Sequence, residues 1–270
     1  MLTTAALLLI VTSNVVLGWD NRRAVEGKKY TLDMALDSVD DMYDRCESKM
    51  RMAVRTTFLF KEMCANVDKF GQVWAYSTGG IPGPDKLKNY HLVAIYIYTD
   101  DSIYKEFNRD VRLGRKDYKG KKYTWNSLHF LLREAIQILK KKQKKCITTY
   151  RGTNHTFNEN VLNTEIRFGS FTSSSTKKKI AMGFGTESCF EIQTCYGADM
   201  SKYSRNPGEK EVLIPPYETF KITAIMKKDQ KKSAWCNTVF MLKSSGFRSD
   251  LNCAMVSIKP QIYHNVSLFD

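Results

Sequence analysis

The sequence has 270 residues, of which 43% are hydrophobic, 26% charged and 12% aromatic. This composition excludes an intrinsically disordered chain and is typical of one large folded domain or two closely associated lobes. The 42 Lys and Arg residues outnumber the 28 Asp and Glu residues and give a formal net charge of +14, so acidic partners have to be considered.

The first eighteen residues predict a signal peptide. They carry no charge, they are centred on the apolar run 5–11, and a charged stretch begins at Asp20. This pattern predicts cleavage before Trp19 and a single mature domain over 19–270. No later run reaches the roughly 18 apolar residues of a membrane span, and the last residues lack the hydrophobic tail that directs a lipid anchor. We therefore expect a secreted, extracellular protein.

The cysteines and two sequons fit the secretory route. None of the seven cysteines has the spacing of a zinc site, so disulfides are expected and no metal is. The odd number leaves at least one thiol free or paired between chains, and the spacing alone does not decide the connectivity. Asn154 and Asn265 begin Asn-X-Ser/Thr motifs and are candidates for glycosylation.

The first half of the chain favours helices. Apolar residues recur at helical spacing over 31–64, which predicts one long or two short amphipathic helices. Gly and Pro predict a loop over 77–88, and the β-branched and aromatic run 91–99 predicts a short buried strand. A further helix is predicted over 124–145. Its lysines at 140–145 either complement the negative end of the helix dipole or bind a polyanion.

The second half favours strands. Helices followed by strands predict an α+β fold, and they argue against a parallel nucleotide-binding sheet, for which no Gly-rich phosphate loop is present either. The β-type runs, separated by turns, lie at 147–150, 165–172, 189–194, 211–214, 220–226, 238–242 and 254–258.

Three short motifs in this half carry candidate chemistry. Arg151 ends a β run and precedes Gly152, which lets another group approach the backbone closely. Ser173 lies in a run of hydroxyl residues. Glu209 and Glu211 flank Lys210, so in a regular strand both carboxylates would project to one side. Taken singly, these motifs are also typical of a surface arginine, a hydroxyl-rich turn and a solvated acidic pair.

Together and in this order, the motifs resemble the R-S-E signature of the vertebrate arginine-specific ecto-ADP-ribosyltransferases, which are related in fold to binary bacterial toxins. The resemblance implies an ADP-ribosyltransferase-like fold, with a helical lobe over about 19–145 packed on two small, mainly antiparallel sheets. The β-rich NAD-binding core would span about 146–260, with NAD in the cleft between the sheets. The resemblance extends over nearly the whole mature chain, at 41–46, 107–112, 128–130, 150–152, 167–175 and 207–218.

The resemblance also implies a role for each motif. Glu211 would stabilise the oxocarbenium character that develops when the nicotinamide–ribose bond breaks. Glu209 would orient the incoming guanidinium and deprotonate or desolvate it. Arg151 would bind the phosphates of the dinucleotide through its planar fork of donors. Ser173 would hydrogen-bond the nicotinamide ribose or hold Glu211.

Further NAD-binding residues follow from the resemblance alone. Phe184 would stack on nicotinamide, and Tyr98, Gly152, Ser170 and Ser204 would line the pocket. Two departures from the family pattern are Lys210, where a third acid is often found, and Ser170, where Gln is common; altered affinity or target preference is expected from them.

The resemblance implies the disulfides Cys46–Cys253 and Cys146–Cys195. For the remaining cysteines we hypothesise a bond between Cys64 and Cys236, which leaves Cys189 unassigned.

The resulting hypothesis is a secreted enzyme that transfers ADP-ribose from NAD to arginine on extracellular or cell-surface proteins. One alternative is an NAD glycohydrolase with little transfer. Another is a catalytically silent cationic protein that binds anionic glycans. The high positive charge would also allow an active enzyme to attach to such glycans, and no specific nucleic acid partner is expected.

Overall fold

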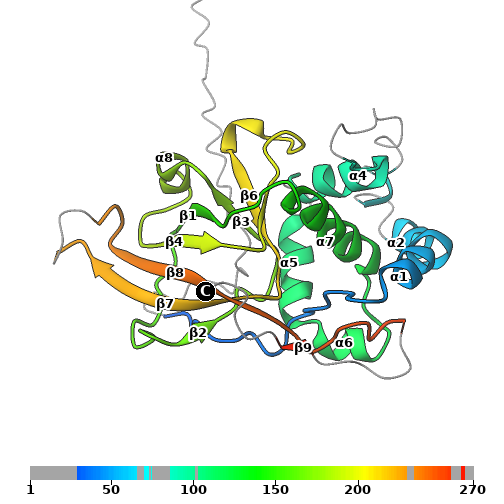
Figure 1. Ribbon diagram of the computed structural model, residues 1–270, viewed down its shortest axis with the longest axis horizontal. Helices are drawn as coiled ribbons and strands as arrows, with labels where there is room; N and C mark the ends of the chain where they lie inside the picture. The colour runs from blue at the N-terminus through cyan, green and yellow to red at the C-terminus, as the bar shows by residue number, and fades with distance from the viewer. Residues whose placement is uncertain are drawn as a thin grey trace, which may run out of the picture.

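Helices dominate the first half of the chain and strands the second, as expected for the α+β class (Figure 1). The computed structural model describes residues 29–65, 70–72, 74, 86–100, 103–229, 234–256 and 263–264. The predicted signal peptide, most of the predicted 77–88 loop and Asn265 lie outside the described residues.

The helical elements form one side of the molecule, apart from a short helix on the sheet (Figure 1). In the part of the chain that the structure describes, no helix is both long and apolar enough to cross a membrane. The helices are α1 (Glu47–Ala53), the π-helical η1 (Val54–Phe58), α2 (Leu59–Ala65), α4 (Asn89–Tyr98), α5 (Tyr104–Leu113), α6 (Arg115–Lys119), α7 (Asn126–Lys140) and α8 (Lys178–Met182).

The predicted helix over 31–64 begins only at Glu47. Before it, aspartate side chains accept backbone hydrogen bonds in tight turns: Asp33 accepts from the amide of Ala35, and Asp41 from the amide of Tyr43. Ala35 and Tyr43 both have positive φ, which is incompatible with a right-handed helix. Local side-chain hydrogen bonds therefore override the helical spacing of this segment.

The predicted strand over 91–99 is wrong, because this run forms the helix α4. Its apolar side chains are buried on nearly all sides, and a fully buried helix has no amphipathic period that would distinguish it from a buried strand. The helix is capped at its start, where the amide of Lys88 donates to Nδ1 of His91 (3.0 Å). His91 in turn bonds Glu134 of α7, so tertiary contacts decide the structure of this run.

The strands form one mixed sheet. Its order is β2-β7-β8-β4-β1-β3-β6-β5, with β9 paired to β8, so the described strands do not divide into the two sheets that the resemblance implied. The β4–β8 pair is parallel and the other strand pairs are antiparallel. The strands are β1 (Ile147–Thr153), β2 (Glu165–Ile166), β3 (Thr172–Ser175), β4 (Ser188–Thr194), β5 (Ala198–Asp199), β6 (Glu211–Ile214), β7 (Glu218–Lys227), β8 (Thr238–Ser249) and β9 (Tyr263–His264).

Two expected strands differ from the structure. The run 165–172 is interrupted at Gly169, whose φ of 70° bends the chain between β2 and β3. Residues 254–256 form a turn, and the rest of the run expected at 254–258 lies outside the described residues.

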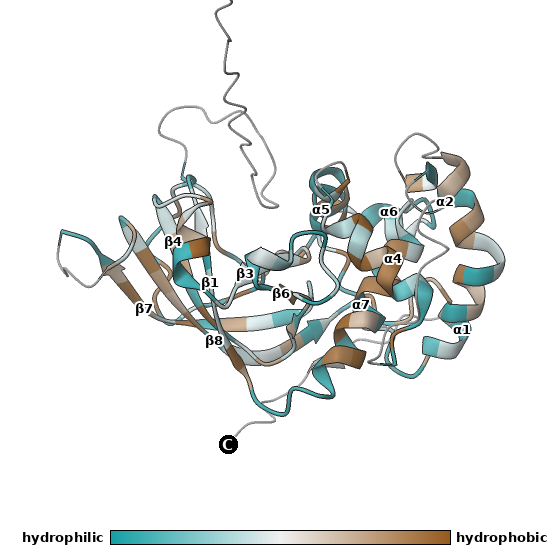
Figure 2. Cartoon of the chain, turned by 90° about the horizontal axis from the view of Figure 1, so that it is seen from above, coloured by the Kyte–Doolittle hydropathy of each residue, from teal (hydrophilic) through white to brown (hydrophobic). Residues whose placement is uncertain are grey.

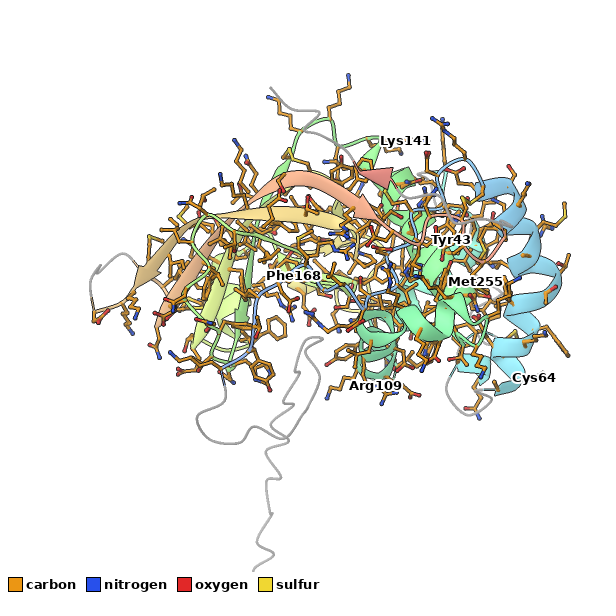
Figure 3. The ribbon with its side chains drawn as sticks, turned by 90° about the horizontal axis from the view of Figure 1, so that it is seen from below. Tyr43, Cys64, Arg109, Lys141, Phe168 and Met255 are labelled. Atoms are coloured by element: carbon orange, nitrogen blue, oxygen red, sulfur yellow. A yellow bond between two sulfur atoms is a disulfide. The ribbon has the colours of Figure 1, made fainter. Side chains whose placement is uncertain are left out.

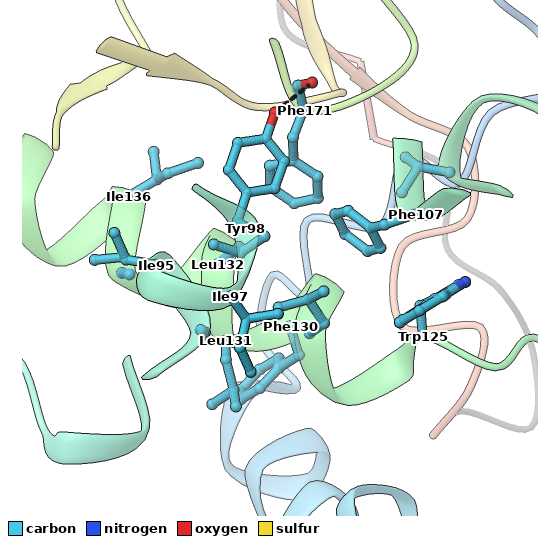
Figure 4. Close-up of a cluster of buried hydrophobic side chains, with 14 of the residues drawn as sticks. Ile95, Ile97, Tyr98, Phe107, Trp125, Phe130, Leu131, Leu132, Ile136 and Phe171 are labelled. Carbon is cyan, nitrogen blue, oxygen red and sulfur yellow. Dashed lines mark hydrogen bonds between the residues drawn. The ribbon is translucent and has the colours of Figure 1, made fainter. Parts of the chain in front are cut away.

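The hydrophobic core has two main parts. One lies among the helices and reaches the sheet at Phe171 and Leu213, and Figure 4 shows its centre around α4 and α7. The other covers the sheet near β4, β7 and β8, where Phe190 and Phe240 stack. Hydropathy colouring shows brown hydrophobic segments on α4 and α7, inside the helical region (Figure 2). The helices therefore pack as a layer against the end of the sheet that contains β3 and β6.

Three disulfides are present, and two of them are those implied by the resemblance, Cys46–Cys253 and Cys146–Cys195. The hypothesised bond between Cys64 and Cys236 is wrong. Cys236 is bonded to Cys189, which ties the segment before β8 to β4. Cys64 is free and exposed at the periphery of the helical region (Figure 3).

Candidate active site

A pocket lies where β1, β3 and β6 meet the segment around α8. The space between its lining atoms, part of which is open to solvent, is about 260 Å³. Five of the predicted site residues line it. The lining residues are Tyr150, Arg151, Ser173, Ser174, Ser175, Ala181, Phe184, Glu209 and Glu211.

Arg151 and Ser173 come from the neighbouring antiparallel strands β1 and β3. The Arg151 side chain is buried, and its Nη1 donates to the backbone oxygen of Ser173 at 2.7 Å. Burial lowers the pKa of Arg151 to about 10, while nearby Tyr98, Tyr104 and Glu211 act in the opposite direction. The guanidinium therefore remains charged at neutral pH and places a positive charge in the pocket wall.

Glu211 begins β6, opposite Ser175 of β3. Only 4% of the residue is exposed, and this burial raises the pKa of its carboxyl to about 7. The negative charge of Glu209 also raises the pKa, whereas hydrogen bonds from Ser173 and Ser204 and the charge of Arg151 lower it. The two serine donors and the Arg151 cation stabilise the charged form, so the buried Glu211 carboxyl is able to ionise at neutral pH.

Glu209 reaches the same pocket from a different kind of element. It ends the 3-10 helix Pro207–Glu209, and Lys210 after it has a left-handed φ of 50°. The prediction that strand alternation aligns Glu209 with Glu211 is therefore wrong, because the chain turns between them. The backbone oxygen of Glu209 accepts from the hydroxyl of Ser175 at 2.7 Å, which holds this turn against β3.

Phe184 and Ala181 form the wall of the pocket contributed by α8 and the turn after it. This segment lies very close to β1 at Gly152, where a Cβ atom would be 2.3 Å from the backbone oxygens of both Ala181 and Gly185. Gly152 thus permits the close approach expected from the sequence. What approaches it is the protein's own backbone.

The remaining predicted site residues lie outside the pocket lining. Tyr98 and Ser204 are buried behind it and bond the residues that form it, as Ser204 does with Glu211. Ser170 precedes β3, where its backbone oxygen accepts from the hydroxyl of Thr172. In the described part of the chain, no three His, Cys, Asp or Glu side chains are grouped to hold a metal ion.

Sequence reasoning missed four lining residues. Three of them lie inside the identified motifs, namely Tyr150 beside Arg151, and Ser174 and Ser175 after Ser173. Their position next to predicted site residues could have identified them. Ala181 has no chemical signature, and only the position of α8 brings it to the pocket.

Comparison with known proteins places the chain in a family. A family model described as NAD:arginine ADP-ribosyltransferase matches residues 32–238, which include every residue lining the pocket. The chain belongs to the NAD:arginine ADP-ribosyltransferase family. Within this family, the erythroblast NAD(P)(+)–arginine ADP-ribosyltransferase of Gallus gallus is 32% identical over 240 residues, covering 86% of this chain and 78% of the chicken protein. The GPI-linked NAD(P)(+)–arginine ADP-ribosyltransferase 1 of Oryctolagus cuniculus is 34% identical over 257 residues, covering 87% and 77%.

Solved structures of ADP-ribosyltransferases share the fold. The crystal structure of the eukaryotic mono-ADP-ribosyltransferase ART2.2 has a TM-score of 0.67 at 28% sequence identity and covers 83% of this chain and 98% of that one. Variants of ART2.2 in complex with NADH and with NAD give TM-scores of 0.66 and 0.65. The ADP-ribosyltransferase-like fold that the resemblance implied is thereby confirmed.

Proposed function

We propose that this protein is a secreted enzyme that transfers ADP-ribose from NAD to the arginine side chains of extracellular or cell-surface proteins and releases nicotinamide. The observation that carries the proposal is the buried Glu211 carboxylate, which shares one pocket with Arg151, Ser173 and Glu209 in a member of the NAD:arginine ADP-ribosyltransferase family.

The donor set suits the nicotinamide end of NAD. When the bond between ribose C1′ and the nicotinamide nitrogen breaks, its electron pair leaves with nicotinamide and positive charge develops on the ribose. A buried carboxylate beside that ribose, Glu211, stabilises the charge more strongly than water does. Ser173 bonds and orients Glu211, Arg151 offers a fixed cation to the phosphates, and Phe184 offers an aromatic face to nicotinamide.

Glu209 is the residue suited to the acceptor. A guanidinium with a pKa above ~12 is a poor nucleophile until a base takes its proton. Glu209 lies at the pocket but is less buried than Glu211, so an arginine arriving from solvent meets it first. In the transfer step a guanidinium nitrogen forms the bond to C1′, and its proton passes to the Glu209 carboxylate.

The Glu209→Gln variant tests this division of roles. The amide keeps the shape of the side chain but does not accept the proton, so transfer to a small guanidine acceptor should fall at least about 100-fold, the scale of general-base contributions. Release of nicotinamide by hydrolysis of NAD should remain measurable, because Glu211 is intact. Equal loss of both activities would contradict the assignment. Hydrolysis by the unmodified enzyme without any adduct would instead favour an NAD glycohydrolase.

Attachment to anionic glycans is a second proposed activity, and it rests on an observation in the sheet. Lys221 of β7 and Lys243 of β8 are exposed and directly opposite each other, an arrangement that is unfavourable for like charges. Gln193 continues this row on β4. The row thus contains two neighbouring cations, with Glu165 of β2 opposite Lys221 and the neutral Gln193 opposite Lys243, and such an exposed pair of cations suits the sulfate groups of a polysaccharide.

The double variant Lys221→Gln/Lys243→Gln tests the glycan proposal. It should elute from immobilised heparin at clearly lower salt than Lys116→Gln/Lys119→Gln, which removes the same charge from exposed positions on α6. Equal elution of the two double variants would mean that only net charge matters and would reject the site.

A further inference from the structure

The C-terminal end of α4 contacts both of the segments whose serines hydrogen-bond Glu211. We propose that this helix end positions the Glu211 carboxylate, through Tyr98 and Ser173 on one side and through Arg205 and Ser204 on the other. Arg205 and Tyr98 are thus positioning residues. The inference rests on the proposed function and adds to it the contacts that hold the reacting carboxylate in place.

The first connection runs through Tyr98, the last residue of α4. Its hydroxyl donates to the backbone oxygen of Phe171 at 3.0 Å (Figure 4). The same hydroxyl lies 3.3 Å from Oγ of Ser173 and accepts from Nδ2 of Asn108 at 3.1 Å. All four residues are buried. When Ser173 donates its one hydrogen to Glu211, the Tyr98 hydroxyl shares its own single hydrogen between the backbone oxygen of Phe171 and Oγ of Ser173.

The second connection runs through Arg205, which lies between β5 and β6. Its guanidinium pairs with the carboxylate of Asp100 and lies over the ring of Tyr96, with 5.6 Å between the guanidinium carbon and the ring centroid. Its backbone amide donates to the hydroxyl of Thr99 at 3.0 Å. Side chain and backbone of Arg205 are therefore both attached to the end of α4.

The neighbour of Arg205 is Ser204, which is 7% exposed and hydrogen-bonds Glu211. Because Arg205 and Ser204 are adjacent, fixing one on α4 limits where the hydroxyl of the other can lie. The helix itself is well anchored, since Val93, Ala94 and Ile97 are buried in the core. One rigid helix end thus sets the positions of two hydroxyl groups that come from separate parts of the chain.

Glu211 is sensitive to these two donors because the charges around it oppose each other. Burial and the charge of Glu209 disfavour its ionised form, while Arg151 and the two serines favour it. Burial and the nearby charge of Glu211 together raise the pKa of the Tyr98 hydroxyl to about 12. Loss of one serine donor moves the balance toward the protonated acid, which does not stabilise positive charge on the ribose.

The test measures nicotinamide release from NAD, with water as acceptor, as a function of pH. In Arg205→Leu the acid limb of the kcat profile should move up by about half to one pH unit, and Ser204→Ala should move it equally. The double variant should show no further shift, because both changes act through one hydroxyl. Arg205→Lys, which keeps the charge, should restore most of the profile.

Arg109→Leu is the matched control. Arg109 lies on α5, pairs with an aspartate as Arg205 does, and its side chain is 48% exposed against 50% for Arg205 (Figure 3). The Arg109→Leu variant should show the acid limb of the kcat profile at the same pH as the unmodified protein. Additive shifts in the double variant, or an Arg205→Leu profile equal to that of the control, would overturn the inference.

A direct titration separates this inference from the proposed function. If the unmodified protein releases no nicotinamide, the proposed function fails. The pKa of Glu211, measured by NMR on its 13C-labelled carboxyl carbon, then decides the positioning role. A higher pKa in Arg205→Leu than in Arg109→Leu supports the role, and equal values reject it.

Discussion

At the level of single residues, Glu211 combines deep burial with the need to carry charge. Its pKa of about 7 lies well above the ordinary value of 4.5, chiefly because burial disfavours the carboxylate. At pH values between 4.5 and about 7, the carboxyl of Glu211 holds a proton in the folded protein that it has lost in the unfolded chain. The contribution of this group to stability is therefore complete below pH 4.5 and is lost as the pH rises through about 7.

This linkage predicts that Glu211→Gln stabilises the fold while it removes activity. The variant should unfold at a temperature about 2–4 °C higher than the unmodified protein at pH 8, the shift that ~1 kcal/mol produces in a domain of this size. At pH 4.5 or below the difference should nearly vanish, since both side chains are then neutral. Thermal unfolding followed by circular dichroism at the two pH values checks this.

Glu165→Gln, at an exposed position on β2, serves as its control and should show little change at either pH. A destabilised Glu211→Gln variant at pH 8 would contradict the assigned cost of burying the charge.

The sequence revealed these residues through their motif and not through their environment. Arg151, Ser173, Glu209 and Glu211 were identified because their types and order match a known signature, and the structure brings them to one pocket. Arg205 was missed, because its contacts with Thr99 and Asp100 join positions more than 100 residues apart. Tyr98 was assigned to the pocket wall and lies behind it, since a sequence does not state which residues touch.

At the level of helices and strands, the local sequence pattern predicts most elements, and tertiary contacts override it in a few. The periodic helix α7 and the strand β6 were predicted well, because each has a clear apolar pattern. The helix α4 was predicted as a strand, because its residues are buried on nearly every side and carry no period. The turn at Lys210 was missed, because a lysine does not signal a left-handed backbone.

The contact between α8 and β1 supports a prediction about Gly152. In Gly152→Ala the new methyl group would overlap the backbone oxygens of Ala181 and Gly185, so α8 and Phe184 have to move. The KM for NAD should rise at least about tenfold, because a pocket wall displaced by even ~1 Å loses its productive geometry. Steady-state kinetics of nicotinamide release measures this.

The comparison variant for this effect is Gly208→Ala, where a Cβ meets nothing within 4 Å. It tests whether replacing any glycine near the pocket has the same result. Similar KM values for the two variants would show that the close approach at Gly152 does not position the wall.

At the level of the whole molecule, disulfides connect parts that are distant in sequence. Cys46–Cys253 spans 207 residues and ties the start of the first helix to the region after β8. Closing so long a loop restricts the unfolded chain, which typically stabilises a protein by about 2–4 kcal/mol. The helical first half, the strand-rich second half and the bonds Cys46–Cys253 and Cys146–Cys195 were expected from sequence and family pattern. The bond Cys189–Cys236 and the joining of the strands into one sheet were not.

The cysteine arrangement predicts one reactive thiol per chain. Of the seven cysteines, all of which the structure describes, six are bonded and Cys64 is exposed. Mass spectrometry after maleimide treatment of the native, unreduced protein should find one adduct, and Cys64→Ser should find none while its melting temperature is unchanged. Labelling that persists in Cys64→Ser would show that one of the three bonds is not formed.

The central claim, transfer of ADP-ribose to arginine, is tested most directly by incubating the protein with labelled NAD and agmatine, a soluble guanidine acceptor. We expect a labelled ADP-ribosyl-agmatine adduct and released nicotinamide, both reduced about 100-fold or more in Glu211→Ala, the scale of removing a preorganised charge-stabilising group. The absence of the adduct from the unmodified protein, or an undiminished yield from Glu211→Ala, would contradict the account.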